Sequence, residues 1–545
     1  MKHIIGFFFL LISVLGIAQK QTQQLPCTIE TTPVLRDKMG ERSYGIQLIG
    51  KDNENDVYYL FLPYHIVYDK VSFGMTKNYY IVKYSSNLKQ IAKEPFNLEK
   101  KDKNNHFETV FFLGEKLEML YYTYKDDDNK SHLYIQQVNK STLKSIGRPK
   151  EIAQLSYSGL KRHRTVVEYE FSEDKSKLLI LYSMLNKESS MLRFKMYVYD
   201  TREMELLWKT SEMPQFKDGI FSYVKYKVGN DGQVYLLGKH YKDEDTYKKR
   251  TITMAKGSRF LYITNSDYTY RVYQYSDNGE LVGASNITIP NKFIRDLDFT
   301  PQRKSILCRG TYSAPGTISV NGVFVFSLDI QNQSIGELST KKIVIPDEEH
   351  LNSSKPELKK FKRITKNNDE WNMFNYNIGE MKKTASGIKY FVVEQTIRGN
   401  VVEKSGNMLY YRPVYKSGNL EVVFLTNDNE IERIGHINKL QFVTDVTNFN
   451  SYIDFGVNGK VYFLYNSFPP APRSSFFKWS KLEDSHLISI DVNDGTQHDY
   501  VLDKYKSKQP VLMPSSVIYL DKNTIMYALM STNLKNYSFR KMIFK

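Results

Sequence analysis

Short hydrophobic runs separated by polar turns repeat along most of the chain. Tyr, Phe, Val, Ile and Leu predominate in these runs, and hydrophobic and polar positions tend to alternate, which is typical of β-strands. In the segment VKYKVGNDGQVYLLGKH (224–240), two such runs flank a polar turn, and this pattern predicts a β-hairpin. Similar hairpins begin at residues 44, 107, 167, 224, 295, 374, 452 and 516, about every 67 residues. The chain therefore contains eight copies of one unit.

A second hairpin lies between successive copies of the first. An example is YRVYQYSDNGELVGA (270–284), in which an alternating strand reaches an Asp-Asn-Gly turn and returns. Each unit thus has four strands, and radial repetition of four-stranded sheets is the composition of a β-propeller. The sequence predicts an all-β fold, a single β-propeller of eight four-stranded blades. Seven blades, or two smaller propellers, are the alternatives if one degenerate unit has been divided wrongly.

The last copy of the second hairpin, YSFRKMIFK (537–545), contains only one strand. A blade that lacks its fourth strand would leave an unpaired sheet edge. The extended segment from Leu25 to Arg36 precedes the first complete blade, so we expect this N-terminal strand to close the last blade. The propeller domain would then cover residues 19–545.

Residues 1–18 are expected to form a signal peptide that lies outside the fold. Lys2 precedes an apolar run from Ile4 to Ile17, which is too short to cross roughly 30 Å of hydrocarbon as a helix. A charged start, a short apolar body and a small residue at the end of the run are typical of secretory signals. We expect an exported protein without a membrane span, periplasmic or associated with the outer membrane, or alternatively extracellular.

The composition excludes several classes of protein. The chain carries 76 basic and 60 acidic residues, a formal charge of +16, but Lys supplies most of the excess. Proteins that read nucleic-acid bases lean on the bidentate Arg fork, so we expect no nucleic-acid partner. Two cysteines are too few for a disulfide-stapled scaffold or a Cys-ligated structural zinc site. Cys27, on the expected closing strand, and Cys308, in the fifth blade, are predicted to lie too far apart to bond.

Motifs for nucleophilic catalysis, metal binding and nucleotide binding are missing from the sequence. It contains no H-E-x-x-H, G-x-S-x-G, GxGxxG or P-loop pattern. The acidic runs at 126–128 and 243–245 lack the spacing of a calcium loop, so solvated loops are the favoured interpretation. We expect no cofactor and no metal site. Asp296, Asp298 and Glu394 are the candidate carboxylates for acid–base chemistry on a sugar, if two of them face each other.

Long connections are expected to gather at one end of the ring. Within a blade, the turns inside each hairpin point to one face, and the links between hairpins and between blades point to the other. The longest irregular segments, 241–269, 346–373, 396–419 and 467–485, are all links of the second kind. Loops on a rigid scaffold often carry binding residues, and interfaces are enriched in aromatic and Arg side chains. The expected partner-binding residues are Tyr410, Tyr411, Arg412, Arg473, Phe476 and Trp479.

Four segments resemble those of exported β-propeller-like proteins of unknown function from low-GC Gram-negative, bacteroidete-type bacteria. They are GNDGQVYLLGKHY, LCRGTYSAPGTISVNGVFVFSLD, IKYFVVEQ and SYIDFGVNGKVYFLYN. The resemblance covers the chain from about residue 160 onward. It implies a propeller fold and export, and it carries no catalytic residues to this chain.

These observations predict a non-enzymatic binding or scaffold module of the bacterial cell envelope. It would be monomeric on its own and would engage a protein or a polysaccharide through the face that bears the long loops. One alternative is a carbohydrate-active hydrolase or lyase, because propellers can hold paired carboxylates near the central channel. Another alternative is an accessory subunit of an export or surface-assembly machine, which would differ from the first hypothesis only in its partner.

Overall fold

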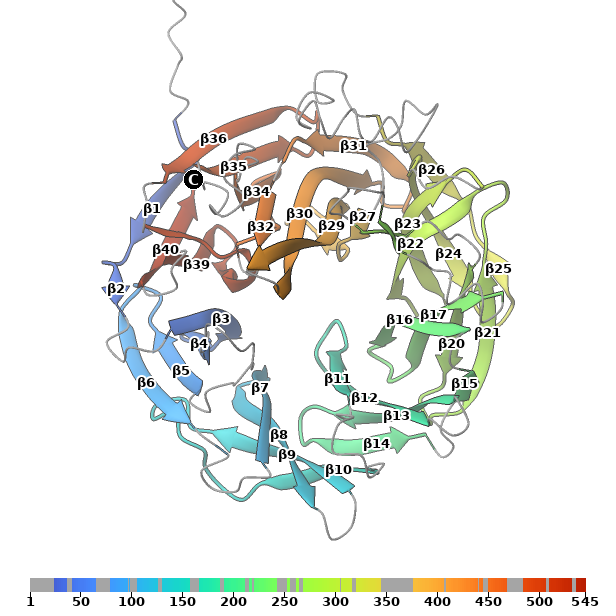
Figure 1. Cartoon of the computed structure of the whole chain (residues 1–545), viewed down its shortest axis with the longest axis horizontal. Helices are drawn as coiled ribbons and strands as arrows, with labels where there is room; N and C mark the ends of the chain where they lie inside the picture. The colour runs from blue at the N-terminus through green and yellow to red at the C-terminus, as the bar shows by residue number, and fades with distance from the viewer. Residues whose placement is uncertain are drawn as a thin grey trace, which may run out of the picture.

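In a computed structural model of the chain, β-sheets surround a central opening (Figure 1). The structure describes residues 24–36, 42–64, 79–96, 98, 105–125, 130–156, 166–186, 191–210, 215–217, 220–242, 252–254, 261–263, 268–303, 305–315, 320–344, 376–405, 408–439, 441–444, 449–467, 484–505, 509–531 and 536–545. Within these ranges, eight antiparallel sheets form the blades of a single propeller. The predicted blade number is confirmed, and the alternatives of seven blades or two rings are wrong.

The first four blades follow the chain order, each with its first strand innermost. Blade 1 contains β3 (Arg42–Lys51), β4 (Val57–Tyr64), β5 (Tyr79–Tyr84) and β6 (Gln90–Phe96). Blade 2 contains β7 (Asn105–Leu113), β8 (Lys116–Lys125), β9 (Lys130–Val138) and β10 (Lys150–Ser156). Blade 3 contains β11 (Val166–Phe171), β12 (Lys177–Asn186), β13 (Met191–Asp200), β14 (Glu205–Lys209) and the short β15 (Gln215–Lys217). Blade 4 contains β16 (Phe221–Val228), β17 (Val234–Tyr241), β20 (Tyr268–Tyr275) and β21 (Leu281–Ile287), with the separate hairpin β18 (Ile252–Met254) and β19 (Leu261–Ile263) inserted after β17.

The next three blades repeat this plan. Blade 5 contains β22 (Phe293–Pro301), β23 (Ile306–Ser313), β24 (Gly322–Asp329), β25 (Ser334–Ile335) and β26 (Ser339–Lys342). Blade 6 contains β27 (Tyr376–Ile378), β28 (Lys382–Lys383), β29 (Lys389–Ser405), β30 (Met408–Leu425), β31 (Ile431–Ile437) and β32 (Gln441–Thr444). Blade 7 contains β33 (Tyr452–Val457), β34 (Lys460–Asn466), β35 (Asp484–Asp491) and β36 (Gln497–Lys504).

Both ends of the described chain contribute to blade 8. Its later strands are β37 (Pro510–Leu512), β38 (Ile518–Asp521), β39 (Thr524–Ser531) and β40 (Asn536–Phe544), with the 3-10 turn η3 (Pro514–Ser516) between β37 and β38. The outer strand comes from the N-terminal side, as β1 (Cys27–Thr31) and β2 (Leu35–Arg36) pair antiparallel with β40. The ladder runs from Cys27 opposite Phe544 to Thr31 opposite Arg540. The predicted closure by the N-terminal strand is confirmed.

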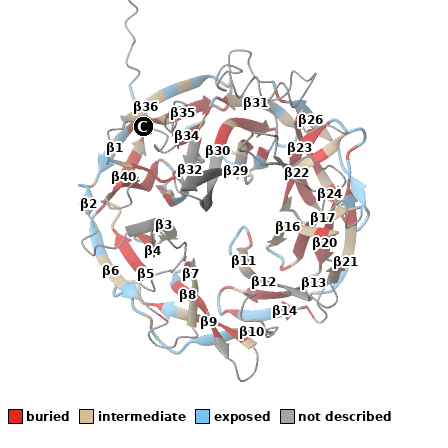
Figure 2. Cartoon of the chain, in the orientation of Figure 1, coloured by how far each residue is buried: buried red, intermediate tan, exposed pale blue. Residues whose placement is uncertain are grey.

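The hydrophobic core is divided among the boundaries between blades. The described residues form eight apolar clusters, and each joins two consecutive blades. Side chains alternate between the two faces of a strand, and each blade packs against a neighbour on either side. Strands inside a blade are therefore buried on both faces. In β12, for example, Leu178 and Ile180 pack toward blade 2, whereas Leu179 and Leu181 pack toward blade 4. Figure 2 shows the result, with buried residues mainly on the middle strands, intermediate residues along inner strands such as β16, and exposed residues along the outer strands.

Polar contacts at the outer edge link blades 2, 4 and 6 to the blades that follow them. Lys150 on β10 donates through Nζ to the carbonyls of Glu203 and Met204, both at 3.1 Å, in the β13–β14 turn of blade 3. Ser285 on β21 donates to the carbonyl of Ile330 at 3.1 Å in the turn of blade 5. Arg433 on β31 donates to the carbonyl of Asp491 at 3.0 Å in the turn of blade 7. The outer strand of one blade therefore repeatedly anchors the outer turn of the following blade.

Two other expectations concern the cysteines and the membrane. Cys27 lies on β1 in blade 8 and Cys308 on β23 in blade 5, and both are buried free thiols. The prediction that they are not bonded to each other is confirmed. Within the described ranges, no helix is long and apolar enough to span a membrane.

Candidate functional site

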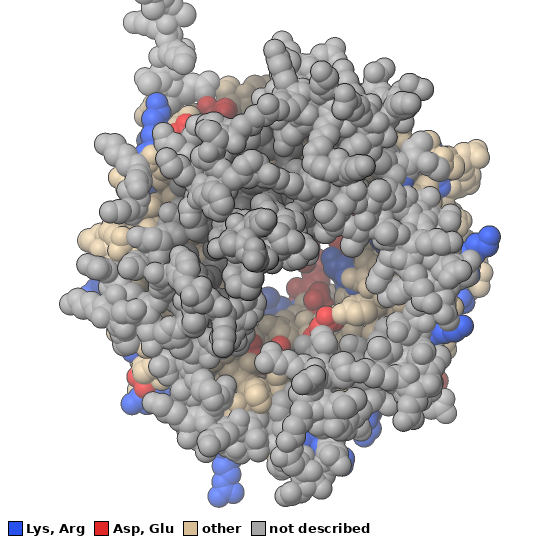
Figure 3. Space-filling view, in the orientation of Figure 1, with Lys and Arg blue, Asp and Glu red and all other residues tan. Residues whose placement is uncertain are grey.

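Charged side chains line the inner wall of the ring. Three consecutive inner strands carry pairs of like charge two residues apart, and such residues share one side of a strand. The sign of the pair alternates between blades: Glu168 and Glu170 on β11, Lys225 and Lys227 on β16, and Asp296 and Asp298 on β22. Figure 3 shows acidic and basic side chains together in the central opening. The wall from blade 3 to blade 5 is therefore a series of complementary charges.

Asp298 is the centre of this arrangement. It forms an ion pair with the fully buried Arg309, which lies directly opposite on β23. Lys225 of blade 4 approaches the other carboxylate oxygen, with Nζ 2.9 Å from Oδ1. Burial alone would raise the pKa of Asp298, but Arg309, Lys227 and Lys225 outweigh it and hold the pKa below its usual range. Asp298 is therefore a structural anion that joins blades 4 and 5.

The neighbouring charges respond to burial. Burial raises the pKa of Glu170, although Lys227 opposes the shift. Burial lowers the pKa of Lys227, and Asp298 acts in the opposite direction. Asp296 has a raised pKa for the same reason as Glu170, while its carboxylate accepts the backbone N–H groups of Leu297 at 3.1 Å and Ile378 at 3.3 Å. The last of these bonds ties blade 5 to β27 of blade 6.

We call Glu170, Lys225, Lys227, Asp298, Arg309 and Glu380 the inner wall cluster. It holds three acidic and three basic groups from four blades, so its charges balance. Acid–base cleavage of a glycosidic bond needs two carboxyl groups that face each other across the bond. Asp298 is committed to Arg309, and the other candidate carboxylate of this strand, Asp296, lies outside the cluster and two residues away on the same strand. This geometry suits adhesion between blades better than catalysis.

Glu394, the third candidate carboxylate, has a separate structural role. It lies on β29 and accepts Nζ of the buried Lys439 at 2.5 Å and the hydroxyl of Ser451 at 2.8 Å. Lys439 also donates to Oε1 of Gln441 at 3.0 Å. Burial lowers the pKa of Lys439, and Glu394 counteracts this shift. Glu394 therefore neutralises a buried ammonium between blades 6 and 7.

A group of carboxylates in the β3–β4 turn resembles a cation site in composition only. The carboxylate oxygens of Asp52, Glu54 and Asp56 lie within 4.8 Å of one another. However, Nζ of Lys83 is 2.9 Å from Asp56 and 3.3 Å from Asp52. Asp52 also accepts the hydroxyl of Tyr58 at 2.8 Å and the backbone N–H of Asp56 at 2.9 Å. An ammonium and local hydrogen bonds thus already satisfy this turn.

The strand order assigns the long connections to one end of the ring, which we call the loop end. The opposite end, where the turns inside each hairpin lie, is the turn end. The segments 241–269, 396–419 and 467–485 join the second and third strands of blades 4, 6 and 7, and 346–373 joins blade 5 to blade 6. All four connections therefore leave the sheets at the loop end.

Two of these connections contain regular structure, which corrects the expectation of irregular loops. Residues 396–405 belong to β29 and 408–419 to β30, and the two strands are paired from Lys389 opposite Leu425 to Ser405 opposite Met408. β-Branched residues such as Val401 and Val402 and aromatic residues such as Tyr410 favour strand structure here. The segment 241–269 contains the β18–β19 hairpin, and β19 contacts β29. In Figure 1, the far end of the β29–β30 hairpin reaches toward the middle of the ring.

The predicted partner-binding residues fall into two groups. Tyr410, Tyr411 and Arg412 lie on the extended part of β30, where they pair with Glu403, Val402 and Val401 of β29. The other three, Arg473, Phe476 and Trp479, lie outside the described residues, as do the acidic runs at 126–128 and 243–245. The assignment of these six residues to a binding site stays a prediction.

Sequence reasoning missed the inner wall, although the sequence carries a signal for it. The first strands of three successive units read E-Y-E-F, K-Y-K-V and D-L-D-F (168–171, 225–228 and 296–299). Paired like charges in a strand that is otherwise apolar indicate a face that is not packed in the usual core. The alternation of sign from unit to unit indicates neighbouring strands that neutralise each other.

Comparison with known proteins does not assign this chain to a family. No family model and no curated protein matches the sequence. Among solved structures, the WD40 domain of SCAP from fission yeast is 9% identical, with a TM-score of 0.36 over 95% of this chain and 98% of that chain. The β-propeller domain of the Trilobed protease from Pyrococcus furiosus is 12% identical, with a TM-score of 0.32 over 86% of this chain and 97% of that one. The polysaccharide lyase Uly1 is 11% identical, with a TM-score of 0.31 over 93% and 91% of the two chains.

Proposed function

We propose that the protein is a non-enzymatic binding module of the bacterial cell envelope that engages a protein or polysaccharide partner through its loop end. The observation that carries this proposal is the contact between β19 and β29. These strands belong to insertions of blades 4 and 6, although blade 5 separates the two sheets. Insertions that meet across a rigid ring form a continuous surface, and such surfaces are where rigid scaffolds carry function.

The charges of the inner wall support binding over hydrolysis. Asp298 and Glu394, two of the three candidate catalytic carboxylates, are each held by a buried cation, Arg309 and Lys439. A general acid needs a proton that it can give up, and a nucleophile needs a free lone pair. An ion pair with a buried cation keeps the carboxylate ionised, so it has no proton to donate, and it occupies the lone pairs that a nucleophile would use. Export, as expected from residues 1–18, would place the loop end among envelope proteins and polysaccharides.

The test removes the outer half of the β29–β30 hairpin without disturbing its base. Residues 400–413 are replaced by Asn-Gly, which joins Gly399 to Val414, two residues that face each other in the ladder. The pairing of Val414–Ser417 with β32 is retained. We expect this variant to lose capture of purified envelope polysaccharide or of outer-membrane protein, with an unchanged melting temperature.

Point substitutions sharpen the same test. The triple change Tyr411→Ala, Arg412→Ala and Trp479→Ala should abolish capture, because aromatic and Arg anchors can each contribute about 2 kcal/mol or more to an interface. The matched control is Asp277→Ala with Asn278→Ala in the β20–β21 turn, at the turn end. Capture that is lost in the control and kept in the hairpin variant would show that the loop end is the wrong face. Capture of assembly-machine subunits alone would identify the accessory-subunit role.

A further inference from the structure

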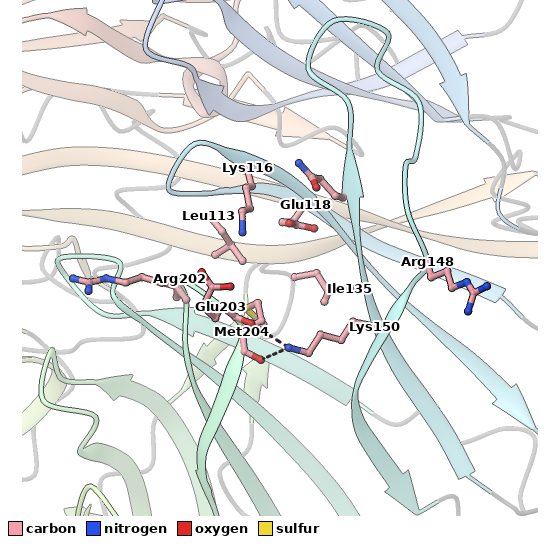
Figure 4. A pocket seen from close by; sticks show the side chains of 11 residues that line it. Leu113, Lys116, Glu118, Ile135, Arg148, Lys150, Arg202, Glu203 and Met204 are labelled. Atoms are coloured by element: carbon pink, nitrogen blue, oxygen red, sulfur yellow. Dashed lines mark hydrogen bonds between the residues drawn. The ribbon is translucent and has the colours of Figure 1, made fainter.

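A cavity of about 170 Å³ lies between blades 2 and 3 (Figure 4). It is reached from the turn end, because residues of the β7–β8 and β13–β14 turns contribute to its wall. Three apolar side chains, Leu113, Ile135 and Met204, line part of it. Its volume is similar to that of an engineered closed cavity that holds benzene, but this cavity is open to solvent, so a small polar molecule can enter it.

The neighbouring blade boundary, between blades 3 and 4, differs from this one in the side chain it carries. Between blades 3 and 4, the indole of Trp208 packs against Gly279 and donates to the carbonyl of Gly232 at 3.0 Å. Trp208 lies two residues after Leu206, which pairs with Tyr199. In blade 2, the residue two positions after the Ser145–Val138 bridge is Gly147. A Cβ at Gly147 would meet no atom within 4 Å, so this position carries no side chain comparable with Trp208.

Both signs of charge surround this cavity. The lining includes Lys116, Arg148, Lys150 and Arg202, together with Glu118 and Glu203. In Figure 4, Lys116 and Glu118 point into the space from β8, Glu203 lies opposite on the blade 3 turn, and Arg148 and Arg202 extend to opposite sides. Lys150 is committed to the carbonyls of Glu203 and Met204. Lys116 is therefore the ammonium best placed to meet a ligand.

Glu118 is the feature that points to a ligand. Its residue is only 9% exposed, and among the described residues its carboxyl has neither a hydrogen bond nor an ion pair. Both carboxyl oxygens are therefore available to a ligand, because Glu118 lines the cavity. Burial raises its pKa, with Lys116 acting in the opposite direction. A cationic group supplied from outside would satisfy the Glu118 carboxylate and offset the cost of its burial.

We propose that this cavity binds a small zwitterion with an aliphatic body, such as a free α-amino acid. The ammonium of the ligand would bind Glu118, with Glu203 opposite, and its carboxylate would bind Lys116. Leu113, Ile135 and Met204 would contact the aliphatic side chain. A sugar acid fits less well, because these three side chains offer no partner to its hydroxyl groups. The site lies at the turn end and is independent of the loop-end function proposed above.

Calorimetric titration of the full chain with L-leucine tests the proposal against three close analogues. Isocaproate lacks the ammonium, isoamylamine lacks the carboxylate, and glucuronate replaces the aliphatic body with hydroxyls. We expect L-leucine to bind at least about tenfold more tightly than each analogue, because each analogue lacks a charge-assisted bond or the apolar contact. Equal binding of isocaproate or glucuronate would identify a simple anion site and overturn the proposal. No heat with any probe at millimolar concentration would overturn it as well.

Variants assign the binding to named residues. Glu118→Gln and Lys116→Gln should each weaken L-leucine binding about tenfold or more, since each removes one charged partner. Glu115→Gln is the matched control, because Glu115 lies in the same turn but pairs with Lys140 at an exposed position. The leucine affinity should also rise with pH as Glu118 ionises. Unchanged affinity in both cavity variants would overturn the assignment, and normal melting of these variants would show that folding is not the cause.

Discussion

Aromatic rings fill the boundary between blades 8 and 1, whereas charged groups join the inner wall from blade 3 to blade 6. At the first boundary, the buried ring of Phe539 lies 4.8 Å from that of Tyr59 and 4.1 Å from that of Tyr84. At the second, Asp298 is held between Arg309 and Lys225. Both regions connect neighbouring blades, but the physical basis of their cohesion differs.

The two kinds of boundary contribute differently to the free energy of folding. Apolar burial contributes about 25 cal/mol for each Å² removed from water, and this contribution does not depend on pH. A buried ion pair roughly breaks even against its desolvation cost, yet removal of one partner is expensive. The aromatic boundary therefore stabilises the ring. The charged wall contributes less net free energy of folding than the aromatic boundary does. Its alternating signs favour contact between oppositely charged neighbouring strands.

The largest effect is expected from deletion of residues 25–36. This deletion removes β1 and β2, exposes the edge of β40, and takes Cys27 from the cluster that joins blades 7 and 8. We expect a loss of at least about 5 kcal/mol, a large part of the stability of an ordinary domain. Thermal unfolding measures it. Deletion of a similar length, 350–361, should change little because loop closure depends weakly on length; equal melting temperatures would contradict the closure.

The next effect concerns the aromatic boundary. Phe539→Ala should lower the free energy of unfolding by about 3 to 5 kcal/mol, because it leaves a cavity against Tyr59 and Tyr84. Urea unfolding at pH 5 and at pH 8 should give the same loss. A loss that depends strongly on pH would show that ionisable groups also control this boundary.

Arg309→Met tests the charged wall directly. It should cost about 3 kcal/mol, since it removes the fully buried partner of Asp298 and leaves this carboxylate to Lys225 and Lys227. Asp298→Leu together with Arg309→Met should recover most of this loss, because the unpaired charge is gone. If the double variant were no more stable than the single one, the proposed balance of charges would be wrong.

A smaller effect should appear in the dependence of stability on pH. The folded pKa of Asp298 is lowered, so its ionised form stabilises the protein above the unfolded pKa, about 3.9, and this contribution is lost as pH falls through the folded value. Asp298→Asn should therefore destabilise the ring most at pH 7 and progressively less in acid. Unfolding curves of both proteins between pH 3 and pH 7 measure the difference; parallel curves would contradict the assignment.

The smallest effect is expected for an ion pair that is exposed to solvent. Glu115 and Lys140 lie 3.6 Å apart with side chains 55% and 37% exposed. Glu115→Gln should change the free energy of unfolding by less than about 0.5 kcal/mol, because water screens exposed pairs. A loss comparable with that of Arg309→Met would remove the distinction between buried and exposed charges.

The repeat pattern predicted most of the fold because alternation within strands is local. It also predicted closure by the segment that contains β1, since the last unit lacked a strand. The β29–β30 hairpin was missed as a regular structure because Thr396–Ser405 does not alternate between hydrophobic and polar residues and was treated as part of a link. The partner of Asp298 could not be predicted without the register that places Arg309 opposite it.

The candidate sites depended still more on three-dimensional packing. Glu394 was a plausible catalytic carboxylate in the sequence, but its partner Lys439 lies 45 residues away. The cavity beside Glu118 is lined by residues of two blades, and Glu118 and Met204 on its wall are 86 positions apart in the chain. Such a juxtaposition becomes visible only in the folded structure.

The pairing of β1 with β40 has a consequence for how the molecule folds. The backbone N–H of Phe539 donates to the hydroxyl of Thr32, 507 residues away in the chain. Bringing ends so distant together costs about 5 to 6 kcal/mol of chain entropy before any closing contact forms. During synthesis, β1 emerges early and has no partner until β40 has been made. Until the two strands pair, the unpaired backbone groups of β1 are open to strands of other chains. Refolding should therefore be slow, and its yield should fall as protein concentration rises.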